Sequence, residues 1–202
     1  MTPIIFYDVG NVIVEANQEL TQKFLTENLR IPLEIAQRFY KIDAYKQFAR
    51  GIISEEEFCD ALRSALKRPD LDNSTLQHAH DIHIYGVNTR VVELLDATRK
   101  KNSTGIITNT LPWQEAKVRQ LIDLSQYVPP ELYFRSHELG KLKADPGFWE
   151  LIQSATGAHY SEMTLIDDSI ANIESLRDLG GRGIQYQNAE QLERVLKQER
   201  IL

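Results

Sequence analysis

Residues 4–12, IIFYDVGNV, pass directly from four apolar or aromatic residues to a carboxylate and a turn of small residues. The first four are β-branched or aromatic, and a run this short favours a buried strand over a helix. Asp8 follows at once, and burying a carboxylate is costly unless it is paired, solvated or bound to a metal ion. The stretch therefore predicts a buried strand that presents Asp8 at its carboxyl end.

Four further short apolar runs look like strands of the same sheet: residues 105–107, 132–134, 163–166 and 183–186. Helical patterns separate these four runs, one opening at Pro112 and another ending before Gly180. Alternation of strand and helix predicts an α/β fold, with a Rossmann-like parallel sheet and helices on both faces.

The stretch from about residue 16 to residue 85 has no convincing strand pattern and is expected to form several helices. The clearest begins at Ser54, with Glu57 placed to complete a capping box. Apolar residues at helical spacing predict two earlier helices: Leu20, Phe24 and Leu29 mark one, and Ile35, Phe39 and Tyr40 the other. We expect residues 1–15 and 86–202 to form the α/β core domain, and residues 16–85 a helical domain inserted into it.

Composition narrows the function classes. The 202 residues carry a formal net charge of -6 and no basic cluster, which argues against a general nucleic-acid binder. Cys59 is the single cysteine, so no intrachain disulfide can form and a cytoplasmic protein is the simplest interpretation. The first residues lack the features of a signal peptide, and no apolar run is long enough to span a membrane.

Three carboxylates are expected at neighbouring strand ends: Asp8 after the first strand, and Asp167 and Asp168 after the run at 163–166. Ligands of parallel α/β sheets bind at this edge of the sheet. Carboxylate oxygens suit Mg²⁺, which also takes up phosphate oxygens. A lysine from the stretch 140–146 would complete a site for a dianionic group.

With these residues in place, the sequence resembles the haloacid dehalogenase-like (HAD) phosphatases over nearly its whole length. The first motif of that family resembles residues 5–12, the second ends in Thr108, and the third is Lys143, with Lys141 as a close rival. The fourth motif resembles the pair Asp167 and Asp168, followed at helical spacing by Asn172. The inserted helices, including residues 51–58, resemble the cap domain of the family, whose substrate-contacting region corresponds here to the segment holding Tyr45 and Arg50.

The resemblance implies that Asp8 attacks phosphorus and forms a covalent aspartyl-phosphate, which water then hydrolyses. It implies a Mg²⁺ ion held by Asp8, the backbone carbonyl of Gly10 and Asp168, with Asp167 bound directly or through water. The ion would let the anionic nucleophile approach the anionic phosphate.

The resemblance also implies the groups that hold the substrate. Thr108 and Asn109 would donate hydrogen bonds to the phosphoryl oxygens, while Lys143 would neutralise charge in the transition state and keep Asp8 ionised. The implied partner is a small phosphorylated metabolite, for a protein that is a monomer or a homodimer and binds neither nucleic acid nor membrane.

Two positions depart from the family pattern. Most HAD phosphatases carry a second Asp two residues after the nucleophile, as the acid that protonates the leaving group, and here that residue is Gly10. HAD dehalogenases lack that Asp too, but they use no magnesium and lack an acidic pair, whereas phosphatases resembling sugar-1-phosphate phosphatases share this turn. Ala144 stands where Pro usually follows the lysine. A catalytically silent phosphate-binding or regulatory protein, and a phosphotransferase, remain alternatives to the phosphatase.

Overall fold

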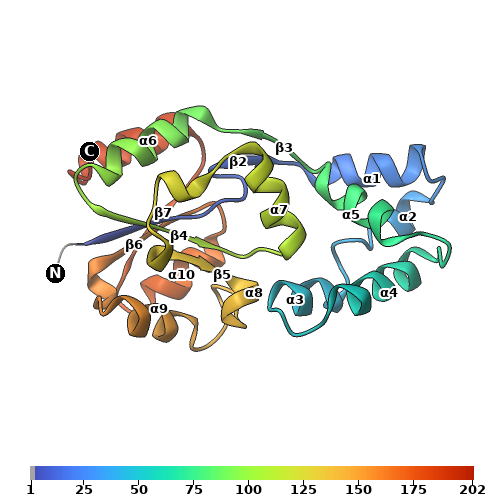
Figure 1. Cartoon of the computed structure of the whole chain (residues 1–202). Coiled ribbons are helices and arrows are strands. Elements are labelled where there is room, and N and C mark those ends of the chain that lie inside the picture. The colour runs from blue at the N-terminus through green and yellow to red at the C-terminus, as the bar shows by residue number, and fades with distance from the viewer. Residues whose placement is uncertain (1–2) are drawn as a thin grey trace.

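The computed structural model describes residues 3–202, and its core is a five-stranded sheet in the order β5-β4-β1-β6-β7 (Figure 1). Every neighbouring pair of these strands runs parallel. The strands are β1 (Ile4–Tyr7), β4 (Ser103–Thr108), β5 (Tyr133–Arg135), β6 (Met163–Asp167) and β7 (Arg182–Gln185). All five predicted strands are therefore present within one or two residues of their expected positions.

Strand β1 is central, and its register fixes where the site can form. Tyr7, the last residue of β1, lies beside Ile106 of β4 and Ile166 of β6. The chain passes to β4 on one side of β1 and later crosses to β6 on the other. This reversal of strand order is where parallel α/β sheets bind their ligands, at the carboxyl ends of the strands.

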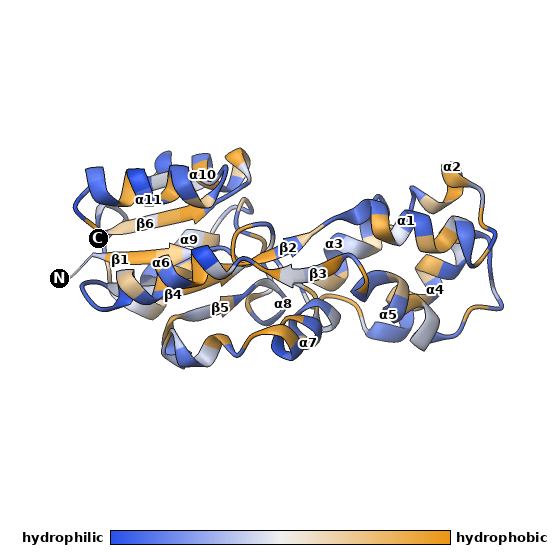
Figure 2. Ribbon diagram, turned by 90° about the horizontal axis from the view of Figure 1, so that it is seen from above, coloured by the Kyte–Doolittle hydropathy of each residue, from blue (hydrophilic) through white to orange (hydrophobic). Residues whose placement is uncertain are grey.

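Alternate residues of β1 face opposite layers of the core, as the period of a strand requires. Ile5 and Tyr7 pack with side chains of helices α6 (Thr89–Arg99) and α11 (Ala189–Gln198). Ile4 and Phe6 pack instead with side chains of α9 (Phe148–Thr156) and α10 (Ile170–Arg177). Both faces of the sheet are thus covered by helices, which explains why apolar residues predominate in β1 and β6 (Figure 2). The predicted α/β fold class is confirmed.

Five helices gather at one end of the molecule, away from the sheet (Figure 1). They are α1 (Gln18–Glu27), α2 (Leu33–Ala36), α3 (Asp43–Ala49), α4 (Glu55–Leu66) and α5 (Asn73–Asp81). We call residues 18–81 the helical insertion. Its core includes Leu25, Phe58 and Leu76, and α4 begins with the predicted capping box between Ser54 and Glu57.

Two expectations for this region are wrong. A two-stranded antiparallel sheet flanks the insertion, formed by β2 (Val14–Ala16) and β3 (Ile84–Val87), so strands reach into residues 16–85. Each strand is too short for a clear alternation, and its partner lies about seventy residues away in sequence, so local pattern gave no signal. The helix expected around Ile35, Phe39 and Tyr40 ends at Ala36, and the chain continues in turns while Phe39 stays buried.

Helix α7 (Pro112–Leu121) packs against the helical insertion. It opens with Pro112 in its first turn, as predicted, and Trp113 then reaches into the core of the insertion. The Trp113 ring lies 5.2 Å from the ring of Phe58 and 5.8 Å from that of Phe48, measured between centroids. The two apolar regions therefore meet at this side chain.

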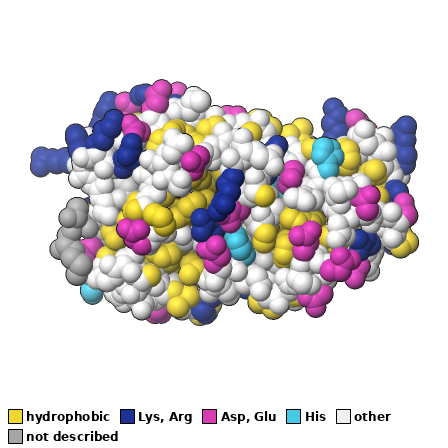
Figure 3. All heavy atoms as spheres, viewed as in Figure 1, with side chains coloured by type: hydrophobic (Ala, Val, Ile, Leu, Met, Phe, Trp, Pro, Cys, Tyr) yellow, Lys and Arg dark blue, Asp and Glu magenta, His cyan; other side chains and the backbone are white. Residues whose placement is uncertain are grey.

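The exterior is mixed in charge. Among the described residues on the face seen in Figure 3, Lys and Arg side chains are interspersed with Asp and Glu. Across residues 3–202, every helix is too short or too polar to pass through a membrane.

Candidate active site

Asp8 lies immediately beyond β1 and is held by the neighbouring strand. Its backbone N–H donates to the Ile166 carbonyl at 2.9 Å, which continues the pairing of β1 with β6. Only 7% of the residue is exposed. The sheet therefore fixes the backbone of Asp8 and leaves its carboxylate at the carboxyl edge.

Lys143 is the buried cation of the site. It comes from the loop between α8 (Ser136–Leu139) and α9, is 1% exposed, and belongs to no strand. Its Nζ donates to Asp8 Oδ1 at 2.6 Å and to Asp167 Oδ2 at 2.5 Å. Lys141, the rival in the sequence, instead donates to the Pro146 carbonyl at 2.6 Å on the surface. The geometry thus joins Lys143, and not Lys141, to the predicted carboxylates.

Two side chains, one just beyond a strand and one on a helix, hold the Lys143 backbone in place. Asn109, just beyond β4, accepts a hydrogen bond from the Lys143 N–H through Oδ1 at 2.9 Å. Ser175 of α10 donates from its hydroxyl to the Lys143 carbonyl at 3.1 Å. Ser175 carried no recognisable signal in the sequence, because its contact depends on the packing of α10 against this loop.

Asp167 ends β6 and is fully buried. Besides Lys143, its carboxylate accepts bonds from the Asn172 side chain at 3.0 and 3.2 Å and from the Ser169 N–H at 2.9 Å. Asn172 lies on α10 one turn beyond the acidic pair, where the sequence placed it. These donors satisfy the carboxylate oxygens that burial removes from water.

Asp168 is more exposed and is held by a residue that sequence reasoning passed over. Asn11 Nδ2 donates to Asp168 Oδ2 at 3.0 Å. Asn11 has φ +55°, a left-handed conformation that Asn adopts more readily than most residues. The position of Asn11 in the turn directly after Gly10 was the sequence feature that could have indicated this role. The turn thereby links the end of β1 to the end of β6.

The three carboxylates converge. One oxygen each from Asp8, Asp167 and Asp168 can be chosen so that all three lie within 4.8 Å of one another. Three carboxylates and the single cation of Lys143 leave a formal charge of -2. Hard oxygen ligands with an excess of two negative charges fit a divalent cation of the Mg²⁺ type.

The electrostatics of Asp8 reflect this excess. Burial raises the pKa of Asp8 to about 7; Lys143 opposes the shift, and Asp167 and Asp168 add to it. Burial alone would lower the pKa of Lys143, but the adjacent Asp8 and Asp167 outweigh it and the pKa is raised. A cation among the carboxylates would favour the ionised form of Asp8.

Thr108, Gly10 and Asn109 complete the set of predicted site residues. Thr108 is the last residue of β4, 4% exposed, and its hydroxyl makes no hydrogen bond to the described residues 3–202. Gly10 and Asn109 line a cavity of about 530 Å³ beside the carboxylates. Tyr45 lines the same cavity, whereas Arg50, the other insertion residue singled out in the sequence, lies outside its lining.

Arg50 instead forms a contact between the helical insertion and the core. Its guanidinium makes two 2.6 Å bonds to the Asp145 carboxylate, which also accepts a bond from the Leu142 N–H at 2.8 Å. Next to it, the Ser136 hydroxyl donates to the Ala49 carbonyl at 2.6 Å. The insertion is thus held against the loop that carries Lys143.

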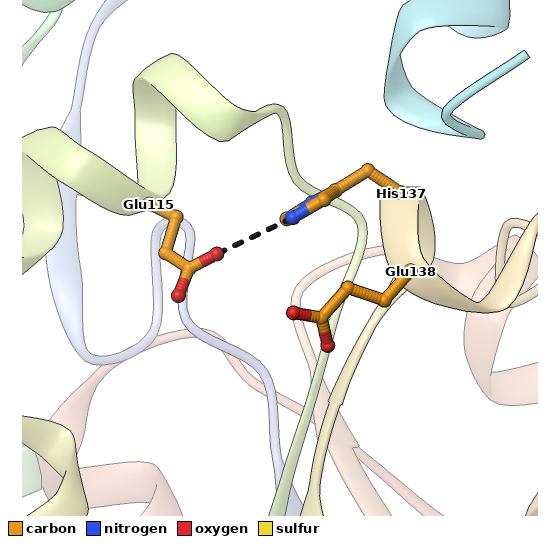
Figure 4. Close-up of side chains that lie close together, drawn as sticks. All are labelled: Glu115, His137 and Glu138. Carbon is orange, nitrogen blue, oxygen red and sulfur yellow. Dashed lines mark ion pairs between the residues drawn. The ribbon is translucent and has the colours of Figure 1, made fainter.

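A second group of possible metal ligands lies outside this site. Glu115 of α7 and His137 and Glu138 of α8 point toward one another (Figure 4). Arg135 already pairs with both glutamates at 2.9 Å, and Arg119 pairs with Glu115 at 2.5 Å. Because two guanidinium groups balance the two carboxylates, the cluster is an ion-pair network between α7 and α8.

No known protein-family model matches the sequence. Solved structures do match it over nearly their whole length. A HAD family enzyme from Bacteroides thetaiotaomicron, solved with magnesium and inorganic phosphate, is 19% identical, with a TM-score of 0.81 over 93% of this chain and 95% of that one. A predicted HAD-like family hydrolase from Porphyromonas gingivalis is 18% identical, with a TM-score of 0.81 over 98% of both chains. L-2-haloacid dehalogenase from Xanthobacter autotrophicus is 15% identical, with a TM-score of 0.66 over 100% of this chain and 85% of that one. The chain therefore has the α/β fold of the HAD family enzymes.

Proposed function

We propose that the chain is a magnesium-dependent phosphatase that hydrolyses a small phosphorylated metabolite, with Asp8 as the nucleophile. The observation that carries this proposal is the buried Lys143 bridging Asp8 and Asp167 at the carboxyl edge of the sheet. With Asp168 beside them, these groups hold an excess of two negative charges. Such a site would repel a phosphate dianion unless a divalent cation bound first.

Asp8, Asp168, the Gly10 carbonyl and Asp167 would hold the magnesium ion. The ion supplies positive charge that lets an anionic nucleophile meet an anionic phosphoryl group. The B. thetaiotaomicron enzyme of the same fold, solved with both magnesium and phosphate, supports this assignment.

The residues of the chain then carry the reaction. A carboxylate oxygen of Asp8 attacks phosphorus as the bond to the ester oxygen breaks, giving an aspartyl-phosphate and an alcohol. Lys143 orients Asp8 and offsets the charge that develops on the phosphoryl oxygens. Thr108 and Asn109, at the end of the adjacent strand, donate hydrogen bonds to those oxygens. Water attacks the aspartyl-phosphate in the second step and releases phosphate.

Gly10 narrows the leaving group. It provides no proton donor, so the departing oxygen must carry developing negative charge, which favours acidic leaving groups such as the anomeric hydroxyl of a sugar. A side chain at this position has room, because a Cβ on Gly10 would meet only Gln114 Nε2, at 3.8 Å. Gly10→Asp is therefore expected to fold, and to speed the cleavage of alkyl phosphates more than that of aryl phosphates.

A dehalogenase of the kind also found with this fold is the competing enzyme class. Its haloacid substrate carries a carboxylate, which would approach three further carboxylates balanced by one lysine. A catalytically silent phosphate-binding protein, favoured by Gly10, is the second alternative. A phosphotransferase would use the same aspartyl-phosphate but pass it to a second hydroxyl.

The deciding experiment assays sugar 1-phosphates, sugar 6-phosphates and p-nitrophenyl phosphate with magnesium, and haloacids in parallel. We expect phosphate release that stops with excess chelator and with Asp8→Asn. Asp178→Asn, which changes an exposed carboxylate at the C-cap of α10, is the matched control and should match the wild type. Asp8→Asn activity above about one-tenth of wild type, a barrier change of only about 1.4 kcal/mol, would remove Asp8 from the nucleophile role. Turnover of haloacids in chelator would favour the dehalogenase.

A further inference from the structure

The 530 Å³ cavity beside the carboxylates extends from the core to the helical insertion. Gly10 and Asn109 line it at the proposed phosphate site, Asn17 lines it at the start of α1, and Tyr45 and Lys46 line it from α3 of the insertion. Its volume is within the range of small-molecule pockets and leaves space beyond a phosphoryl group. The part of the substrate that does not react would occupy this space.

The cavity wall is rich in hydrogen-bond donors and contains no Asp or Glu. Asn109 uses its side-chain oxygen to accept from the Lys143 N–H, and Asn17 uses its oxygen to accept from the Glu19 N–H. The side-chain NH₂ groups of these two residues can therefore donate hydrogen bonds to a ligand. Gln114, which lies over Gly10, adds a third amide. Such a wall suits a ligand with many acceptor oxygens and offers no counter-ion to an ammonium group.

Lys46 is the cationic side chain of this wall. It is exposed on α3, and its Nζ makes no ion pair or hydrogen bond with residues 3–202. His83 also lines the cavity, but burial lowers its pKa to about 4, so it is neutral at pH 7. The positive charge in the cavity thus comes from one side chain, carried by the insertion and separate in sequence from the phosphate site.

We propose that the substrate is a hydroxylated phosphomonoester whose non-reacting end carries a second anionic group, a carboxylate or a phosphate, that binds Lys46. This inference rests on the phosphatase reaction proposed above and adds to it the class of substrate. The amides of Asn17 and Gln114 contact the hydroxyls, Asn109 stays with the phosphoryl group, and Lys46 selects the second anion.

The test compares matched pairs of substrates in the presence of magnesium. Glucose 1-phosphate is set against glucuronic acid 1-phosphate for the carboxylate and against glucose 1,6-bisphosphate for the phosphate, so the leaving group is anomeric in each pair, and glucosamine 1-phosphate represents an ammonium group. We expect KM to be about tenfold lower for at least one of the two compounds that carry a second anion, the gain of one charge-assisted hydrogen bond. Glucosamine 1-phosphate should be the poorest substrate.

Lys46→Met should raise KM for the preferred compound about tenfold while leaving kcat, and KM for the neutral partner, within about twofold. Lys46→Arg should keep the preference. Lys41→Met, which removes an exposed lysine of the insertion outside the cavity, is the control and should change neither constant. Equal KM values within both pairs, or a Lys46→Met effect shared by all substrates, would overturn the proposal.

Failure of the phosphatase itself is recognised separately, because p-nitrophenyl phosphate reports Asp8-dependent turnover without a second anion. Binding of the same pairs to Asp8→Asn protein, measured by calorimetry, needs no turnover. Tighter binding of the compound with the second anion, lost with Lys46→Met, supports the substrate class even if no turnover is seen. Equal binding within each pair contradicts it.

Discussion

Replacing Lys143 by Met is the most informative change to the proposed site. Methionine keeps most of the length and apolar volume of the lysine stem but removes the ammonium group. Asp8 and Asp167 then lose the donor that each has at 2.6 and 2.5 Å. Because Lys143 is 1% exposed, water cannot replace the lost charge without opening the site.

The expected cost follows from this burial. Removing one partner of a buried ion pair destabilises a protein by about 3–5 kcal/mol, since the remaining charge stays buried and unpaired. Here one lysine pairs with two carboxylates, so removing it also leaves the repulsion between the two carboxylates unopposed. Asp8, whose pKa is already raised, can reduce the cost by taking up a proton, which limits the loss. At pH 7 we expect about 3–5 kcal/mol, out of a total of about 5–15 kcal/mol for a typical domain.

Urea unfolding followed by tryptophan fluorescence measures this loss. Trp149 packs in the core between α9 and the sheet and Trp113 in the insertion, so the two report on both parts of the molecule. The measurement is made in chelator and repeated with magnesium, which should narrow the gap between variant and wild type by restoring positive charge. Lys101→Met, at an exposed lysine, should stay within about 0.5 kcal/mol. A loss below about 1 kcal/mol for Lys143→Met at pH 7 in chelator would refute the argument that this lysine offsets the buried charge.

Three further outcomes are expected. Asp168→Asn should raise the magnesium concentration that gives half-maximal activity by about tenfold or more, because a charged ligand is lost; an unchanged midpoint would exclude Asp168 as a ligand. In urea unfolding, Gly51→Ala should destabilise the protein by about 2 kcal/mol more than Gly140→Ala, because both glycines have positive φ but only at Gly51 would a Cβ meet a backbone oxygen of α8, at 2.2 Å. Equal losses of stability in the two variants would contradict that contact. Burial lowers the pKa of His83 from 6.5 to about 4, so His83 binds its proton more weakly in the folded state, and its contribution to stability is present above pH 6.5 and lost as pH falls. Between pH 7 and pH 5 the free energy of unfolding should therefore fall by about 2 kcal/mol more for wild type than for His83→Gln, and His159→Gln should behave as wild type. Parallel plots of unfolding free energy against pH for all three proteins would contradict the burial argument.

The strands and their end residues were predictable because both signals are local. Each parallel strand is a short apolar run buried on two faces, and a carboxylate directly after such a run stands out, as Asp8 and Asp167 do. Their convergence followed from the rule that parallel strands end at one edge. The order of the strands adds only that β1 lies between β4 and β6.

What escaped prediction depends on partners far apart in the chain. The strands β2 and β3 stabilise each other across the insertion, and neither is long enough to be seen alone. The sequence pattern favoured Lys143 over Lys141, but only the packing decides between them, because Lys143 points inward to Asp8 and Lys141 points outward to the Pro146 carbonyl. Arg50 was expected near the substrate because of its position in the insertion, but its partner Asp145 is ninety-five residues away.

That last contact connects the two parts of the proposed site. Asp145 binds Arg50 through both oxygens and also accepts the Leu142 N–H, so one carboxylate holds both the insertion and the residue before Lys143. The ion pair is part-buried, so its direct contribution to stability is modest. Its main effect is to hold the loop that carries Lys143 against the insertion. The same insertion carries Lys46 at the cavity. Docking of the insertion therefore bears on both ends of the proposed substrate: it braces the loop that carries Lys143 at the proposed phosphate site, and it places Lys46 at the cavity proposed to hold the rest of the substrate.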